Sequence, residues 1–186
     1  MKARAITVAG GVLLAVSTTL VAFLAQEESG GSDRVLTVYA DKLAQGLPTV
    51  CNGLTKAVTK EPIVVGETWS DWKCEVVEAD AIYATQVALA KCFTHTPPQS
   101  VFDAASSHAW NFGPGATCGS DAMRAWNRGE WALGCQRLEV ADDGRPVWSF
   151  VKTGRILSNG KPEMRFVRGL AARRGRERGL CYEGVP

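Results

Sequence analysis

The sequence predicts an α+β domain in which a small β-sheet lobe precedes a larger helical lobe, with a cleft between the two. Strand-like alternation over residues 34–41 indicates the sheet lobe, and helical periodicity from residue 67 onward indicates the helical lobe. A third observation, an uncharged run over residues 5–25, indicates a hydrophobic segment before them. We set residues 1–25 apart as a hydrophobic anchor segment. Residues 26–186 are expected to form one domain, because about 160 residues is an ordinary domain size.

The N-terminal run is long but weakly hydrophobic. Its 21 residues carry no charge, and a helix of roughly 20 apolar residues spans a bilayer core. However, 11 of the 21 are Ala, Gly, Ser or Thr. Lys2 and Arg4 lie before the run, which predicts a cytoplasmic start and export of the rest. A cleaved signal peptide is the alternative, but a cut after Ala25 places Phe23 where a small residue is needed. We therefore expect an uncleaved anchor in the inner membrane.

Charge is balanced in the exported part but unevenly distributed. Setting Lys2 and Arg4 aside from the 21 basic residues leaves 19, which equals the 19 acidic residues. Basic residues gather near the C-terminus, at Lys161, Arg165, Arg168, Arg173, Arg174, Arg176 and Arg178. This cluster is either a solvated helix face or a surface attracted to an anionic cell wall or membrane. Nothing in the sequence is typical of a nucleic-acid module, so no nucleic-acid partner is expected.

The chain has six cysteines, and none of them has the C-x-x-C spacing of a zinc site. An even number of cysteines in an exported chain favours disulfides, which persist outside the cytoplasm. Sequence alone does not select the connectivity. Our working pairing is Cys51–Cys74, Cys92–Cys118 and Cys135–Cys181.

The predicted sheet covers residues 34–66. Residues 34–41 alternate with β-branched side chains, residues 49–51 are expected to form the returning strand, and Asn52-Gly53 is a strong turn signal.

Helices are expected to follow the sheet. Thr68 and Asp71 indicate an N-terminal cap for a helix reaching residue 91. The later expectations are a helix from Pro97-Pro98 to residue 111 ended by Gly113-Pro114-Gly115, a short helix at 120–126, a helix capped by Asn127 that reaches residue 138, a hairpin-like turn at 158–160, and a last helix at 162–178.

Three motifs in the exported part resemble those of a known family. They are Tyr39-x-Asp41 with Gly46, Thr49 and Gly53-x-Thr55; then Trp110-Asn111-x-Gly113; then Gly169-Leu170 with Arg173, Arg174, Glu177 and Leu180. Together they are similar to phage-type lysozymes, glycoside hydrolase family 24. A weak anchor fused to such a domain also resembles the signal-anchor-release endolysins, which lyse bacteria at the end of phage infection. The resemblance implies a lysozyme-like fold.

The resemblance assigns catalytic roles by position. Asp41 and Thr49 match the aspartate and threonine that hold the attacking water in the family. They lie eight residues apart, a longer spacing than the family's, which predicts a longer turn at Leu43–Gln45.

The position of the catalytic acid departs from the family pattern. The family's glutamate lies closer to the aspartate, where this chain has Ser32. Glu28 is favoured as the acid, because the glycine-rich stretch after it can loop out and let it reach the cleft. Glu27 is the next alternative and Asp33 a remote third.

The implied activity is inverting hydrolysis of the β-1,4 bond between N-acetylmuramic acid and N-acetylglucosamine in bacterial peptidoglycan. Such a reaction needs one carboxylic acid and a second carboxylate nearby, and no metal or organic cofactor. Two rival readings are a non-catalytic wall-binding protein with this fold and a lytic transglycosylase. The anchor is expected to hold Glu28 away from Asp41 until release into the periplasm. A holin would act with the protein functionally, not necessarily by contact.

Several other residues have ordinary structural interpretations. His108 is expected to be packed, Asn111 to brace a helix end, and Arg173 and Arg174 to form ion pairs, with Glu177 as a candidate partner. Trp110 is the tryptophan expected in the cleft. The tryptophans expected in the core are Trp69, Trp72, Trp126, Trp131 and Trp148.

Overall fold

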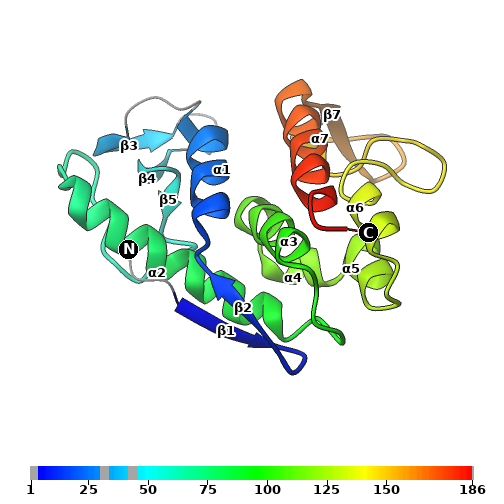
Figure 1. The fold of residues 1–186 in the computed structure, drawn as a ribbon. Helices are drawn as coiled ribbons and strands as arrows, with labels where there is room; N and C mark the ends of the chain where they lie inside the picture. Colours follow the sequence, from blue (N-terminus) through cyan, green and yellow to red (C-terminus); the bar gives the residue numbers. More distant parts are fainter. Residues whose placement is uncertain (1–3, 30–33, 42–45, 186) are drawn as a thin grey trace.

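The computed structural model describes residues 4–29, 34–41 and 46–185, and its mixed α+β architecture confirms the predicted fold class. The elements are β1 (Arg4–Val8), β2 (Gly11–Ala15), α1 (Thr18–Ser29), β3 (Val35–Asp41), β4 (Leu47–Cys51), β5 (Leu54–Thr55), α2 (Asp71–Ala90), α3 (Gln99–Phe112), α4 (Pro114–Cys118), α5 (Asp121–Trp126), α6 (Trp131–Gln136), β6 (Phe150–Ile156), β7 (Pro162–Phe166) and α7 (Arg168–Tyr182). The sheet of β3, β4 and β5 lies at one end of the long helix α2, helices α3 and α4 pack beside its other half, and α5 to α7 lie farther from it (Figure 1).

The N-terminal segment does not form one long apolar helix here. Residues 5–25 instead form the hairpin of β1 and β2 and the first two turns of α1. The hairpin turns at Ala9 and Gly10, both with positive φ, and glycine adopts such angles at little cost. Within the described part of the chain, no helix is long and apolar enough to cross a bilayer. The expected anchor is therefore part of the folded domain in this structure.

Burial explains why the segment folds onto the domain. Ile6, Val8 and Ala15 are buried in the same cluster as residues of α2 and α3, and Leu20 and Leu24 are buried against Ile82 of α2. Removing such side chains from water is favourable, by about 2 kcal/mol for each large one.

Polar side chains of α2 and α3 bind the backbone of the segment. Gln99 accepts a hydrogen bond from Leu14 N (2.9 Å) and donates one to Leu14 O (3.0 Å). Gln86, fully buried, accepts from Val16 N (2.8 Å). Ser17 donates to Asp103 (2.7 Å) while its oxygen accepts from Leu20 N at the start of α1 (3.0 Å). These hydrogen bonds supply partners to backbone groups from the end of β2 to the start of α1.

The carboxyl of Asp103 makes stability depend on pH. Burial raises the pKa of Asp103 to about 6, although Ser17 and Gln99 donate hydrogen bonds to it. An unfolded aspartate has a pKa of about 4, so between these values only the folded state keeps the proton. This contribution to stability is complete below about pH 4 and is lost as the pH rises through about 6, a loss of about 3 kcal/mol.

We therefore expect Asp103→Asn to remove this component of the pH dependence. Urea unfolding at about pH 4 and about pH 7 should show a loss of roughly 3 kcal/mol in the parent that the variant lacks. Equal pH dependence in the two proteins would show that Asp103 does not hold the proton.

The small lobe matches the predicted strands and turn. Strand order is β3-β4-β5, all antiparallel, with Tyr39 opposite Thr49 and Asp41 opposite Leu47. The turn at Asn52-Gly53 has the positive φ of 80° at Gly53, and Asn52 N donates to buried Glu78 of α2 (2.7 Å). Strand structure ends at β5, so residues 56–66 are turns and irregular chain rather than the predicted sheet.

Helix α2 agrees with the prediction except at its cap. Ser70, rather than Thr68, accepts the hydrogen bond from Lys73 N (3.1 Å). Thr68 instead forms a β-bridge with Thr37, which brings this part of the chain to the edge of the small sheet. Trp69 is buried as expected, whereas Trp72 is 72% exposed and does not belong to the core.

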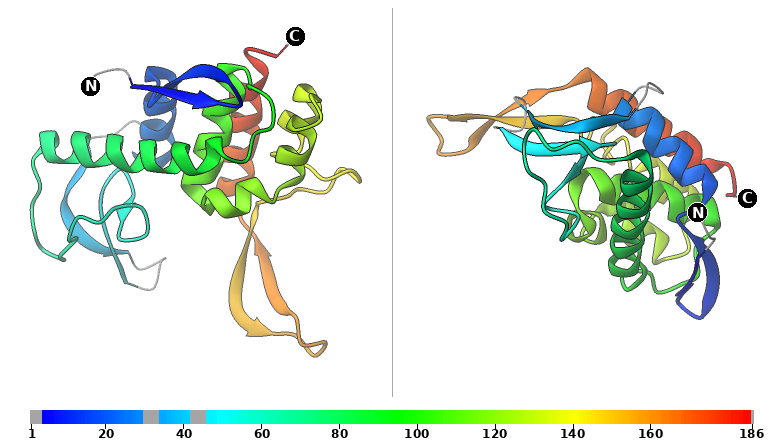
Figure 2. Two further views of the ribbon diagram at one scale, coloured as in Figure 1. Left: turned by 90° about the horizontal axis from the view of Figure 1, so that it is seen from below. Right: turned by 90° about the vertical axis from the view of Figure 1, so that its left-hand side faces the viewer.

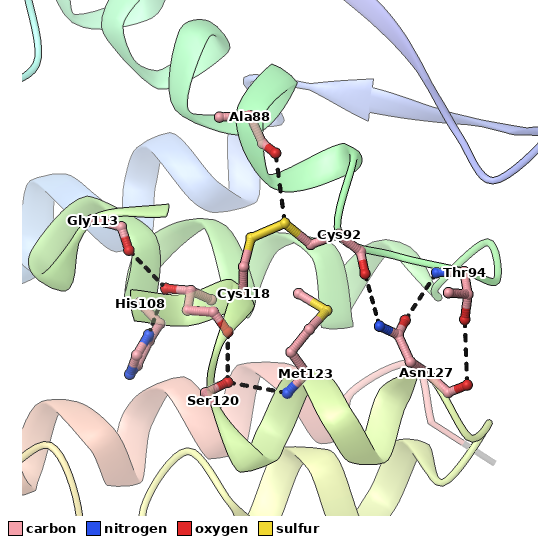
Figure 3. The surroundings of a disulfide bond; sticks show 10 residues. Ala88, Cys92, Thr94, His108, Gly113, Cys118, Ser120, Met123 and Asn127 are labelled. Carbon is pink, nitrogen blue, oxygen red and sulfur yellow. Dashed lines mark hydrogen bonds between the residues drawn. A yellow bond between two sulfur atoms is a disulfide. The ribbon is translucent and has the colours of Figure 1, made fainter. Parts of the chain in front are cut away.

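The helical lobe confirms α3 and α5, but two details differ. Gly113 ends α3 as predicted, and the chain at once begins the unpredicted helix α4 at Pro114. Asn127 ends α5 rather than starting α6. Its side chain donates to Cys92 O (2.7 Å) and accepts from Thr94 N (2.9 Å), as Figure 3 shows. Asn127 therefore ties α5 to the end of α2, a distant contact that no local pattern encodes.

Three disulfides join the elements with the predicted pairing, Cys51–Cys74, Cys92–Cys118 and Cys135–Cys181. The first links the small lobe to α2, the second links the end of α2 to α4 (Figure 3), and the third links α6 to α7. Each closes a loop in the unfolded chain and so reduces its entropy, typically by about 3 kcal/mol in free energy.

The C-terminal region differs from the predicted helix at 162–178. Residues 162–166 form β7, which pairs with β6 around the expected turn at 158–160, and the helix α7 covers Arg168–Tyr182. Figure 2 shows this hairpin projecting far from the helices.

Candidate active site

A cleft of about 670 Å³ lies between the small lobe and the helical lobe. The lining comes from the end of α1, the β4–β5 turn, α2 and the junction of α3 with α4. Its members are Glu28, Gly53, Thr55, Ala57, Val58, Ala84, Thr85, Ala109, Trp110, Asn111, Phe112, Gly113 and Pro114. The expectation that Trp110 lies in the cleft is confirmed, and Asn111 also lines it.

Glu28 reaches the cleft from the last turn of α1. Its side chain is 22% exposed, and Oε1 accepts a hydrogen bond from Nη1 of Arg173 at 2.7 Å. Its Oε2 lies 2.9 Å from the point where a Cβ on Gly53 would be. The carboxylate therefore lies against the β4–β5 turn at Gly53, and a methyl group at this position would require the carboxylate to shift.

A buried ionic cluster on α7 holds the Arg173 side chain. Glu177, fully buried, accepts hydrogen bonds from Arg173 (3.3 Å), Arg174 (2.8 Å) and Ser107 of α3 (2.7 Å). Burial raises the pKa of Glu177, and Arg174 and Arg173 act in the opposite direction. The predicted ion pairs of these arginines with Glu177 are confirmed, and Arg173 joins this buried cluster to Glu28.

Glu27, on the same helix, has a side chain that pairs with a different arginine. Its side chain is only 3% exposed and forms a two-point ion pair with Arg176, with 2.7 Å between Oε2 and Nη2. Among the described residues that line the cleft, Glu28 is present and Glu27 is not. Asp33 and Ser32, the other positions considered, lie outside the described residues.

Asp41 and Thr49 lie on the neighbouring sheet. Thr49 is opposite Tyr39 in the β3–β4 ladder, and Asp41 is two residues beyond Tyr39, so the three side chains share one face. Thr49 is buried and its hydroxyl donates to Leu47 O (3.1 Å). Neither Asp41 nor Thr49 is among the described residues that line the cleft volume. The predicted longer turn at Leu43–Gln45 lies outside the described residues.

Asp41 and Glu28 both lie near the phenol of Tyr39. The pKa of the Tyr39 phenol is raised by burial and by the negative charges of Asp41 and Glu28. Both carboxylates are therefore close enough to act on the same hydroxyl, although they come from different elements. General acid–base cleavage of a glycosidic bond requires two carboxyl groups near each other. Of these two, Glu28 lines the cleft volume and Asp41 lies on the neighbouring sheet.

His108 is excluded from this chemistry by its surroundings. It is fully buried, and its Nδ1 lies 2.8 Å from Thr117 Oγ1. Burial lowers the pKa of His108 well below its usual value, with Arg174 and Arg173 adding to the effect. The expectation of a packed histidine is confirmed.

Gly53 offers a direct test of the geometry at Glu28. We expect Gly53→Ala to lower turnover about a hundredfold, because the added methyl group displaces the carboxylate by about an ångström. Gly46→Ala is the matched control, since Gly46 has nearly the same φ (82° against 80°) but no described residue has an atom within 4 Å of its Cβ position. Equal losses in the two variants would assign the effect to backbone strain.

The chain matches a known protein family in sequence and several solved structures in fold. Residues 33–177 match the sequence model of the family described as phage lysozyme. No curated protein is similar enough in sequence to count as a relative. The endolysin from Escherichia coli O157:H7 phage FAHEc1 superposes with a TM-score of 0.72 at 20% identity, covering 90% of this chain and 93% of that one.

Two further solved structures share the fold. The muramidase domain of SpmX from Asticaccaulis excentricus gives a TM-score of 0.65 at 20% identity, covering 89% of this chain and 96% of that one. The active form of the P1 phage endolysin Lyz gives 0.63 at 21% identity, covering 89% and 84%. At these identities the likeness establishes the shared fold.

Proposed function

Because the chain belongs to the phage lysozyme family, we propose that it is an endolysin that hydrolyses the β-1,4 bond between N-acetylmuramic acid and N-acetylglucosamine in bacterial peptidoglycan. Its role would be lysis of the host at the end of phage infection. The observation that carries the proposal is the carboxylate of Glu28, which lines the interlobe cleft and is oriented by Arg173.

The proposed reaction is a direct displacement with inversion. Glu28, protonated, gives its proton to the glycosidic oxygen as the bond from that oxygen to C1 of N-acetylmuramic acid breaks. Asp41 and Thr49 hold a water on the opposite face of the sugar, and Asp41 accepts a proton as the water oxygen bonds to C1. Inverting pairs leave room for this water with carboxyls roughly 6.5–9.5 Å apart. No metal or organic cofactor takes part.

We also propose that residues 5–25 control activity as a signal anchor. Before release they would lie in the inner membrane, with the rest of the chain exported. After release into the periplasm they would form β1, β2 and the start of α1, as in this structure. Support comes from α1 itself, which contains both the last residues of the anchor and Glu28. A helix that extends from the membrane would hold Glu28 at the lipid surface, away from Arg173 and Asp41.

Partners follow from the same proposal. Peptidoglycan is the substrate, the inner membrane holds the inactive form, and a holin would depolarise that membrane without needing to contact the enzyme. No nucleic acid is involved.

Mass spectrometry of the soluble fragments from purified peptidoglycan tests the proposed function. We expect fragments with hydrated, reducing N-acetylmuramic acid ends. Anhydro ends would instead identify a lytic transglycosylase. No fragments, together with cosedimentation of the protein with peptidoglycan, would identify a non-catalytic wall-binding protein.

A further inference from the structure

The C-terminal basic cluster divides into two groups with different environments. On α7, Arg173, Arg174, Arg176 and Arg178 are all engaged with carboxylates, namely those of Glu28, Glu177, Glu27 and Glu139. Lys161, Arg165 and Arg168 are exposed and form no ion pair with any residue that the structure describes. The first group is structural, and the second is available to an external partner.

The available charges lie on and beside the projecting hairpin of β6 and β7 (Figure 2). Residues 150–166 contain four basic residues, Lys152, Arg155, Lys161 and Arg165, against the single acid Glu163. Glu163 is already occupied by Thr153 (2.6 Å) and, more loosely, by Arg155 (4.0 Å). The hairpin is thus a positively charged arm.

The same arm carries five exposed large apolar side chains. At its tip Ile156 is 68% exposed and Leu157 is 44% exposed. Nearer the body, the rings of Phe150 and Phe166 pack 5.5 Å apart yet remain 39% and 45% exposed, and Met164 is 48% exposed. The ladder pairs Phe150 with Phe166 and Lys152 with Met164, so these four share one face. Clustered exposed apolar residues mark an interaction surface.

The combination of charge and apolar surface selects one class of partner. Peptidoglycan offers sugars and peptide carboxylates, which would satisfy the cations but gives no apolar environment to aliphatic side chains. A bilayer containing anionic lipids offers phosphates for the cations and hydrocarbon for Ile156 and Leu157. Each basic residue near such a surface strengthens binding about fivefold at moderate salt.

We propose that the β6–β7 hairpin docks on an anionic lipid bilayer, with its tip at the boundary between headgroups and acyl chains. The contact is separate from the N-terminal segment, because it lies on another element and uses exposed side chains of the folded domain. It is also independent of the proposed enzymatic activity. The released protein would thereby stay near the membrane surface rather than diffuse freely.

Flotation of the full chain with vesicles tests the proposal. The vesicles are an equal mixture of phosphatidylethanolamine and phosphatidylglycerol, compared with phosphatidylcholine alone. One variant removes charge (Lys161→Gln with Arg165→Gln), and a second removes apolar surface (Ile156→Ser with Leu157→Ser). The control, Lys56→Gln with Lys60→Gln, removes the same charge at exposed positions of the small lobe. All four proteins carry the same N-terminal segment, so differences belong to the altered side chains.

We expect binding to the anionic vesicles to fall more than tenfold in the charge variant, to fall also in the tip variant, and to persist in the control. Unaltered thermal unfolding confirms that the variants are folded, as expected for exposed positions. Binding that is equal for all four proteins, equal on both kinds of vesicle, or undetectable in the parent would overturn the proposal. So would loss of peptidoglycan binding in the hairpin variants without any change on vesicles.

Discussion

Glu28→Gln is expected to lower turnover of peptidoglycan about a thousandfold, the typical value of a general acid. Glutamine keeps the shape and one acceptor for Arg173 but has no proton to give to the leaving oxygen. Glu27→Gln is the matched control, being the adjacent residue on the same helix with the same chemical change. Since Glu27 pairs with Arg176 rather than lining the cleft, we expect it to retain most activity.

Initial rates of fragment release from purified peptidoglycan, measured beside thermal unfolding, separate catalysis from folding. Glu28→Gln should unfold close to the parent temperature, while Glu27→Gln should lose some stability with its ion pair. A loss of activity confined to Glu27→Gln would move the acid to that residue. Comparable losses in both variants would mean that the ionic cluster, not one acid, limits the rate.

Gly11→Leu is expected to trap the protein in the membrane-held, inactive form. A Cβ at residue 11 would lie 2.3 Å from Cγ2 of Thr96, whose hydroxyl donates to Val8 O. Overpacking of this kind costs about 2 kcal/mol, which disfavours the docked hairpin. The added leucine also favours the bilayer. The two effects act in the same direction, and together should shift the distribution toward the membrane by about a hundredfold.

Fractionation of expressing cells into membrane and soluble pools, with the time of lysis recorded, measures this shift. Thr18→Leu is the control, because Thr18 is exposed at the start of α1 and leucine there adds apolarity without a clash. We expect a modest shift for Thr18→Leu and a large one, with delayed lysis, for Gly11→Leu. Normal lysis timing in Gly11→Leu would refute control by docking of this segment.

The parts of the fold that follow from local sequence were predictable. Strand β3, the Asn52-Gly53 turn and helices α2 and α3 each depend on short-range patterns of side-chain alternation, turn residues and helix ends. The N-terminal segment was not predictable in the same way. Its mild hydrophobicity suits both a bilayer and the buried surfaces of α2 and α3, and only the three-dimensional position of Gln86, Gln99 and Asp103 reveals the second alternative.

The candidate site also has features that local sequence predicts and features that depend on distant residues. The motif around Tyr39 predicted Asp41 and Thr49, and the glycine-rich stretch after Glu28 favoured Glu28 over Glu27. Neighbouring residues on a helix point about 100° apart, so the two glutamates have different surroundings that the sequence does not show. Those surroundings are set by Arg173, which pairs with Glu28, and Arg176, which pairs with Glu27. The two arginines lie 145 and 149 residues away from their respective partners. The close approach of the Glu28 carboxylate to Gly53 is likewise a contact between distant parts of the chain.

The anomeric form of the first product tests the central claim, that the bond is broken between Glu28 on one side and a water held by Asp41 and Thr49 on the other. Proton NMR during the first minutes of digestion reads this form at the new N-acetylmuramic acid end. Direct displacement at a β-linkage predicts that the α-anomer appears first and then equilibrates. Initial appearance of the β-anomer would contradict the account, because it requires two successive displacements through an enzyme-bound intermediate.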